Sequence, residues 1–219
     1  MTKINKKFLI FDVDGVLIDS KKNMEISWIA VQKKYLLQNI SFSNYFSNIG
    51  RPFFDILKII GINNNYKKIK KTYDNESKKN NDRVFYFDGI IKVLKELKKK
   101  KYSLNILTSK DLTRTKLFLN KYISLFDYIE CDDGIIEGKP NPRKMNKLIK
   151  KLKAKRYECV YIGDTNVDYK TAKNAKIDFL FANWGYGKNY NYKQKCSKPI
   201  DLIKIFWKNL SIYTKLMLK

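Results

Sequence analysis

Two aspartates follow a short apolar run near the N-terminus of this 219-residue chain. The run Phe8–Phe11 ends at Asp12, and Asp14 and Gly15 come directly behind it. A short continuous apolar run is typical of a strand buried on both faces of a parallel sheet. Residues i and i+2 of an extended strand share a face, so both carboxylates can point at one spot. Because like charges held this close repel unless a cation or a proton separates them, the pair indicates a divalent metal.

A simpler interpretation of this segment is a strand end followed by a polar Asp-Gly turn. Three later segments, each beside a predicted strand, favour chemistry instead. They are Thr108-Ser109, the Gly-Lys-Pro turn that contains Lys139, and Gly163-Asp164 with Asp168 close behind. In open α/β sheets the reactive site lies beyond the carboxyl ends of the strands, where these side chains are expected to meet.

In this order, the four segments resemble the motifs of the haloacid dehalogenase superfamily, most of whose members are phosphatases. The resemblance extends from Phe8 to Trp184 and is closest to the phosphoglycolate-phosphatase-like group. Its departures are small, since Ser109 stands where many members have Asn and Asp88 where many have Pro.

The resemblance implies roles for the polar residues that would act on the phosphoryl group. Asp12 would be the nucleophile and would form an aspartyl-phosphate. Asp14 would be the general acid and base, which argues against a dehalogenase, since that reaction has no phosphate leaving group to protonate. Thr108, the amide of Ser109 and Lys139 would bind the phosphoryl oxygens.

The resemblance also implies a magnesium site. Asp12, the carbonyl of Asp14 and Asp164 would hold Mg²⁺, which prefers oxygen ligands in octahedral geometry. Asp168 would support these ligands without binding the metal directly.

Residues 21–86 are predicted to form a small all-helical unit between strands. Two apolar stripes at helical spacing indicate this, namely Met24, Trp28, Val31, Tyr35 and Phe53, Leu57, Ile60. In the resembling family a mobile cap occupies this place, so we expect a core of residues 1–20 and 87–219 and a cap of residues 21–86. Arg51, in a loop of the cap, would either bind the far end of an anionic substrate or lie on the surface.

The remaining pattern alternates strands and amphipathic helices. Apolar runs predict further strands over 102–110, 126–130, 159–163 and 178–184, and Pro199 begins a final helix that includes Trp207. The expected fold class is α/β, a Rossmann-like doubly wound parallel sheet with the small helical cap inserted after the first strand.

The chain is strongly basic, with a formal net charge of +25. This charge suggests an acidic partner, such as nucleic acid, an anionic membrane or a phosphorylated substrate. Nearly all of it is Lys, however, whereas nucleic-acid readers rely on Arg for bidentate contacts. We therefore interpret the charge as compositional bias. A basic nucleic-acid-binding protein is the alternative from a different functional class. That alternative does not explain why carboxylates and Lys139 stand beside the ends of the predicted strands.

Composition narrows the remaining classes. The chain has no His, which excludes His-based triads and HExxH zinc sites, and its three Cys residues are far apart. Its longest apolar runs are too short to span a bilayer. We expect a soluble, cytoplasmic, Mg²⁺-dependent phosphatase acting on a small phosphorylated metabolite, as a monomer or homodimer, with no nucleic-acid or membrane partner. A sugar-phosphate mutase of the same superfamily would share all four motifs and stays open.

Overall fold

The computed structural model describes residues 6–187 and 192–206, and its centre is a six-stranded sheet. The strand order is β5-β4-β1-β6-β7-β8, and every neighbouring pair is parallel. The strands are β1 (Phe8–Phe11), β4 (Ser103–Asp111), β5 (Tyr128–Asp132), β6 (Cys159–Gly163), β7 (Asp178–Ala182) and β8 (Lys195–Cys196). The predicted Rossmann-like α/β class is therefore confirmed.

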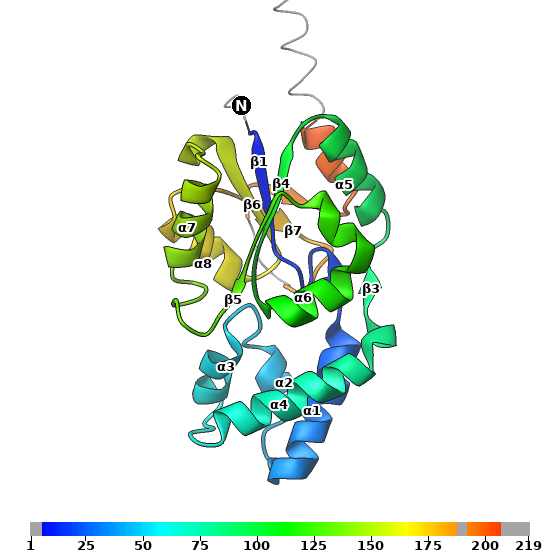
Figure 1. Cartoon of the computed structure of the whole chain (residues 1–219), viewed down its shortest axis with the longest axis vertical. Coiled ribbons are helices and arrows are strands. Elements are labelled where there is room, and N and C mark those ends of the chain that lie inside the picture. The colour runs from blue at the N-terminus through cyan, green and yellow to red at the C-terminus, as the bar shows by residue number, and fades with distance from the viewer. Residues whose placement is uncertain (1–5, 188–191, 207–219) are drawn as a thin grey trace, which may run out of the picture.

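Helices cover both faces of the sheet (Figure 1). They are α5 (Ile90–Lys99) and α6 (Leu112–Leu119) on one face, and α7 (Arg143–Lys151) and α8 (Asn166–Asn174) on the other. Successive residues of β1 alternate between two hydrophobic clusters, with Leu9 and Phe11 in one and Ile10 in the other. Because both faces are buried, the strand is apolar throughout, which explains the continuous run that predicted it.

Four further helices lie beyond the carboxyl ends of the strands (Figure 1). They are α1 (Lys21–Tyr35), α2 (Phe42–Phe46), α3 (Phe53–Ile59) and α4 (Tyr66–Lys79). They share a hydrophobic cluster of their own, in which Trp28 stacks on Tyr45 with ring centroids 4.6 Å apart. The helices predicted around the two apolar stripes are present, whereas α2 was not predicted.

A two-stranded antiparallel ribbon joins this helical unit to the sheet. Its strands, β2 (Ile18–Asp19) and β3 (Phe85–Tyr86), pair the entry and the exit of the helical segment. Short 3₁₀ helices occupy Asn81–Arg83, Asn120–Leu125 and Arg156–Glu158. The ribbon was not predicted, because two-residue strands carry no periodicity of their own.

Other strand boundaries differ from the prediction by a few residues. The third main strand runs over Tyr128–Asp132 instead of 126–130, and β7 ends at Ala182 instead of residue 184. Residues 201–206 are helical, as predicted from Pro199, whereas Trp207 lies outside the described residues.

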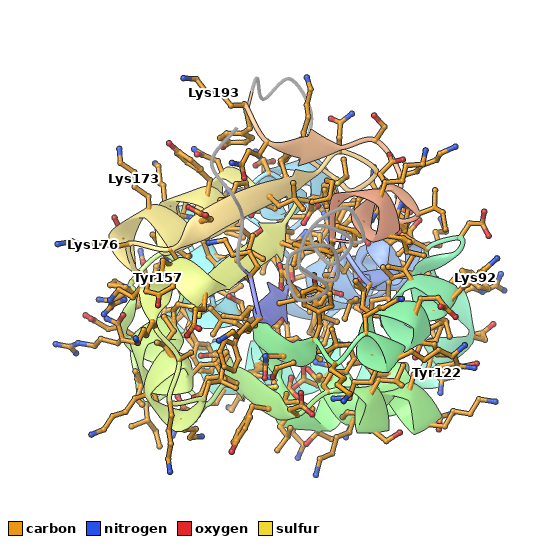
Figure 2. The ribbon with its side chains drawn as sticks, turned by 90° about the horizontal axis from the view of Figure 1, so that it is seen from above. Lys92, Tyr122, Tyr157, Lys173, Lys176 and Lys193 are labelled. Carbon is orange, nitrogen blue, oxygen red and sulfur yellow. The ribbon has the colours of Figure 1, made fainter. Side chains whose placement is uncertain are left out.

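Lysines project outward on several sides of the molecule. Figure 2 shows Lys92 on the opposite side from Lys173 and Lys176, each pointing away from the body of the protein. Among the described residues, no helix combines the length and the apolar character needed to cross a bilayer.

Candidate active site

The sheet brings the predicted site residues together at one edge. β1 pairs with β4 and β6, and Phe11 is in register with Ile106 and Ile162. The residues that follow these strand positions therefore meet beyond the centre of the sheet, where the strand order changes direction. A cavity of about 50 Å³ lies there, and its lining includes Asp12, Asp14, Thr108, Ser109, Lys139 and Arg51.

Asp12 is the most central of these side chains and is only 3% exposed. Its Oδ1 accepts a hydrogen bond of 2.8 Å from the amide of Val13, and its Oδ2 lies 2.9 Å from Nζ of Lys139. Burial raises the pKa of Asp12 above its ordinary value, although Lys139 acts in the opposite direction. The carboxylate is thus fixed in place, and additional positive charge beside it would favour its ionised form.

Lys139 stands at the centre of a buried polar network. Its ammonium donates to Oδ1 of Asp168 at 2.7 Å and to the hydroxyl of Tyr161 at 3.1 Å. Burial alone would lower the pKa of Lys139, but the carboxylates of Asp12 and Asp168 raise it above its ordinary range. The lysine is therefore a fixed cation beside the candidate nucleophile.

Three buried carboxylates form a group that can hold a metal ion. Asp12, Asp164 and Asp168 each offer an oxygen, and these oxygens lie within 4.8 Å of one another. Oδ1 of Asp164 is buried and accepts no hydrogen bond from any residue that the structure describes, whereas its Oδ2 accepts from the amide of Tyr186 at 2.7 Å. Burial raises the pKa of Asp164, and the charges of Asp168 and Asp12 raise it further. An unpaired, buried carboxylate oxygen is the feature that a hard cation such as Mg²⁺ would satisfy.

Asp168 differs from the other two members, because both of its oxygens are already engaged. Oδ1 binds Lys139 and lies 3.0 Å from the hydroxyl of Tyr161. Oδ2 accepts from the amide of Thr165 at 3.0 Å and from its hydroxyl at 2.6 Å. The carboxylate oxygens of Asp12 and Asp164 are therefore more available to a metal ion than those of Asp168.

Two glycines leave room for the carboxylate of Asp164. A Cβ atom at Gly15, whose φ is +81°, would lie 2.1 Å from Oδ2 of Asp164. A Cβ atom at Gly185 would lie 2.4 Å from Cβ of Asp164. Any larger residue at either position would displace the candidate metal ligand.

The side chain of Asp14 is held apart from the carboxylate group. Its Oδ1 accepts a hydrogen bond from the hydroxyl of Ser20, and its Oδ2 lies 3.1 Å from Nζ of Lys110. Ser20 directly precedes α1, so the carboxylate is connected to the start of the helical unit. The side chain of Asp14 thus lines the cavity without being one of the three grouped carboxylates.

Thr108 and Ser109 lie where β4 departs from regular pairing. The register between β4 and β5 shifts between Leu107 and Asp111, and the residues at this shift line the cavity. Oγ1 of Thr108 accepts from the amide of Lys110 at 3.2 Å, and Oγ of Ser109 donates to the carbonyl of Gly50 at 2.7 Å. The segment therefore lines the cavity and also contacts the helical unit.

The loop around Arg51 packs against the loops that follow the strands. A Cβ atom at Gly50 would lie 2.9 Å from Oγ1 of Thr165, and one at Gly138 would lie 2.4 Å from Cγ of Pro52. Arg51 lines the cavity, and its side chain makes no hydrogen bond or ion pair with any residue that the structure describes. The sequence left open a surface position for Arg51, and the structure brings this side chain to the cavity.

The structure adds residues that sequence reasoning missed. Lys110 and Arg114 line the cavity, and Tyr161 orders the network around Lys139. The hydroxyl of Tyr186 accepts from the amide of Ser20 at 2.6 Å, which links the Asp164 loop to the start of α1. Of these residues, only Lys110 could have been predicted from its sequence neighbours, because it directly follows Thr108 and Ser109. The contacts of the others involve residues that are distant in the sequence.

Comparisons with known proteins agree with this geometry. A family model described as haloacid dehalogenase-like hydrolase matches residues 9–182. The chain is 24% identical to pyrophosphatase PpaX of Bacillus mycoides, over 93% of this chain and 97% of the relative. It is 26% identical to phosphoglycolate phosphatase of Aquifex aeolicus, over 91% of this chain and 96% of the relative. A hydrolase of Pseudomonas syringae shares the fold with a TM-score of 0.81, at 21% identity over 93% of this chain and 99% of that chain.

Proposed function

This chain belongs to the haloacid dehalogenase-like hydrolases, and we propose that it is a Mg²⁺-dependent phosphatase that cleaves a small phosphate monoester through an aspartyl-phosphate. The observation that carries the proposal is the buried pair of Asp12 and Lys139 beside the unpaired Oδ1 of Asp164. The pair supplies a fixed nucleophile, and the unpaired oxygen supplies a place for the cation that the nucleophile needs.

The proposed reaction has two displacements at phosphorus. In the first, an oxygen of Asp12 bonds to phosphorus while the ester P–O bond breaks, and Asp14 gives its proton to the departing oxygen. In the second, Asp14 takes a proton from a water molecule, whose oxygen bonds to phosphorus and releases Asp12. The contacts of Asp14 with Ser20 and Lys110 support this role, because they orient its carboxyl group at the cavity.

We assign the binding of the phosphoryl oxygens to Thr108, the amide of Ser109 and Lys139. All three residues line the cavity with Asp12, and Lys139 is a permanent cation there. Fixed donors of this kind stabilise the charge that spreads over the equatorial oxygens in the transition state.

We assign Mg²⁺ to Asp12, the carbonyl of Asp14 and Asp164, with Asp168 orienting its neighbours. The engaged oxygens of Asp168 and the unpaired oxygen of Asp164 support this division. When bound, the ion would reduce the repulsion between the carboxylates and an incoming phosphate.

We propose that residues 21–86 act as a cap over a core of residues 1–20 and 87–219, and that Arg51 contacts the part of the substrate that does not react. The packing of Gly50 and Pro52 against core loops supports this assignment. The names of the relatives, a pyrophosphatase and a phosphoglycolate phosphatase, support a small phosphorylated metabolite as the substrate.

The proposal is tested by a phosphatase screen of the purified full chain. The screen covers sugar phosphates, phosphoglycolate, nucleotides and pyrophosphate, with added Mg²⁺ and with a chelator. We expect release of inorganic phosphate that requires Mg²⁺ and is lost in Asp12→Asn. Transfer of the phosphoryl group to a second position on the sugar, without free phosphate, would show a mutase instead.

A further inference from the structure

The guanidinium of Arg114 lines the cavity that contains Asp12, yet the proposed chemistry makes no use of it. Arg114 lies in the first turn of α6 and is only 6% exposed. Its Nε donates to Oδ2 of Asp111 at 2.7 Å and lies 3.2 Å from Oδ1 of Asp74 in α4. An arginine side chain carries five N–H donors, and its hydrogen bonds to the described residues use only the one on Nε. The donors on Nη1 and Nη2 are therefore available to a ligand.

A purely structural role accounts for only part of this arrangement. Asp111 and Asp74 balance the charge of Arg114, and the ring of Tyr73 lies 5.3 Å from its guanidinium carbon. However, the contacts of Arg114 with these two carboxylates are made through Nε, and neither carboxylate accepts from Nη1 or Nη2. The cluster thus contains unused donors, whereas a closed structural network would pair them with acceptors.

Arg51 supplies a second cation on the same cavity. Its side chain has no hydrogen bond or ion pair within residues 6–187 and 192–206, although it lines the cavity. A third cation, Lys110, is almost fully buried and is paired with Asp14. Lys110 and Arg114 thus have carboxylate partners, whereas Arg51 has none among the described residues and leaves positive charge at the cavity without a partner.

These arginines belong to the side of the cavity next to the cap helices. Arg114 contacts Tyr73 and Asp74 of α4, and Arg51 stands in the loop that precedes α3. Lys139, in contrast, is fully engaged by Asp12 and Asp168. The arginines therefore meet the part of a substrate that extends away from the nucleophile.

We propose that Arg114, together with Arg51, binds a second anionic group of the substrate, so that the enzyme selects small phosphate compounds with a carboxylate or a second phosphoryl group. The inference rests on the proposed phosphatase function. A guanidinium with free terminal donors matches either anion through two parallel hydrogen bonds.

The first test uses pairs of substrates that differ in one charge. The pairs are phosphoglycolate against 2-hydroxyethyl phosphate, and 3-phosphoglycerate against glycerol 3-phosphate. Pyrophosphate, which carries a phosphoryl group in place of the carboxylate, distinguishes the two anions. For wild type with Mg²⁺ we expect a kcat/KM that is roughly tenfold to a hundredfold higher for the member with the carboxylate in at least one pair. If the second anion is a phosphoryl group, the same advantage should appear for pyrophosphate over 2-hydroxyethyl phosphate.

The second test asks whether Arg114 causes this preference. Arg114→Met should reduce the ratio of kcat/KM between the preferred charged substrate and its uncharged counterpart by about tenfold or more, chiefly through KM. Arg114→Lys keeps a positive charge beside Asp111 and Asp74 but lacks the planar guanidinium with its parallel N–H donors, so it should give an intermediate ratio. This variant replaces Arg114→Met in the test if the Met variant does not fold. Lys92→Met removes an exposed charge that points away from the body of the protein (Figure 2), and it should leave the ratio unchanged.

Two results would overturn the inference. One is a wild-type ratio near unity for both pairs together with no preference for pyrophosphate. The other is an unchanged ratio in a folded Arg114 variant. If wild type hydrolysed none of these compounds, nor p-nitrophenyl phosphate, the proposed function itself would fail and the inference with it.

Discussion

The ammonium nitrogen of Lys139 lies 2.9 Å from Oδ2 of Asp12, and both side chains are almost completely shielded from solvent. A carboxylate attacks a phosphate dianion only when the repulsion between them is reduced. The lysine supplies part of that compensation from a position fixed by Asp168 and Tyr161. The proposed chemistry and the packing of the core therefore depend on the same buried lysine.

Removing Lys139 should damage both turnover and folding. Lys139→Ala leaves Asp12 and Asp168 buried without their partner, which typically costs about 3–5 kcal/mol of unfolding free energy. Turnover should fall for every substrate, including p-nitrophenyl phosphate, because the lysine acts on the transferring group. Urea unfolding and steady-state kinetics measure the two effects.

A matched control for this variant is Lys6→Ala. Lys6 is also buried and paired, with Asp178, but it precedes β1 at the opposite edge of the sheet. We expect Lys6→Ala to lose stability and keep wild-type turnover once folded. Normal turnover in Lys139→Ala would rule out the proposed role of this lysine.

Replacing the nucleophile should abolish the covalent step. Asp12→Asn keeps the shape of the side chain, so we expect the fold to persist while turnover falls by roughly a thousandfold or more. The variant also replaces one of three neighbouring buried carboxylates by a neutral amide, while Lys139 keeps Asp168 as its partner. Its melting temperature should therefore not fall below that of wild type without metal. Retention of a tenth of wild-type turnover on a good substrate would contradict the assignment.

Magnesium should stabilise the protein more at higher pH. Burial raises the pKa values of Asp12 and Asp164 in the folded state above their unfolded values of about 4. Above about pH 4 the folded state therefore holds more protons than the unfolded state. The unfolding free energy of the metal-free protein falls as pH rises from about 4 to the folded-state pKa values of these two groups. Bound Mg²⁺ compensates the ionised carboxylates, so the gain in melting temperature on adding Mg²⁺ should increase from about pH 5.5 to about pH 8.

Asp164→Asn serves as the control for this measurement. Its amide is neutral at both pH values, so the gain from Mg²⁺ should be small at each. An equal Mg²⁺ effect in the wild type at both pH values, or none at either, would contradict the metal site.

Arg51 should influence the choice of substrate more than the chemical step. Arg51→Ala should lower kcat/KM for a preferred anionic substrate relative to p-nitrophenyl phosphate by about tenfold to a hundredfold, the value of a lost charge-assisted contact. Arg83→Ala, which removes an exposed arginine of the same segment, is the control. Equal losses for both substrates in the Arg51 variant would show a structural role.

The sequence predicted those parts of the molecule that depend on local pattern. The apolar run before Asp12 marked a buried strand. Asp111, directly behind the segment 102–110 that predicted another strand, is the N-cap of α6, and its side chain accepts from the amide of Arg114 at 3.0 Å. The capping box of Ser41 and Asn44 that begins α2 was also a local signal, and it was overlooked.

Other features depend on contacts between distant residues. Tyr161 lies within an apolar strand and shows no polar pattern, yet its hydroxyl contacts Lys139 and Asp168. The partner of Arg114 in the helical unit, Asp74, is 40 positions away in the sequence. Such pairs become visible only once the fold places the two segments side by side.

The most direct test of the account follows the configuration at phosphorus during hydrolysis. Wild-type enzyme with Mg²⁺ would act on a phosphorothioate ester made chiral at phosphorus by its sulfur and one oxygen isotope, in water labelled with another oxygen isotope. Each in-line displacement inverts the phosphorus centre, so attack by Asp12 followed by attack by water should release inorganic thiophosphate with net retention. Net inversion would show that water attacks the ester directly, and it would contradict the aspartyl-phosphate on Asp12.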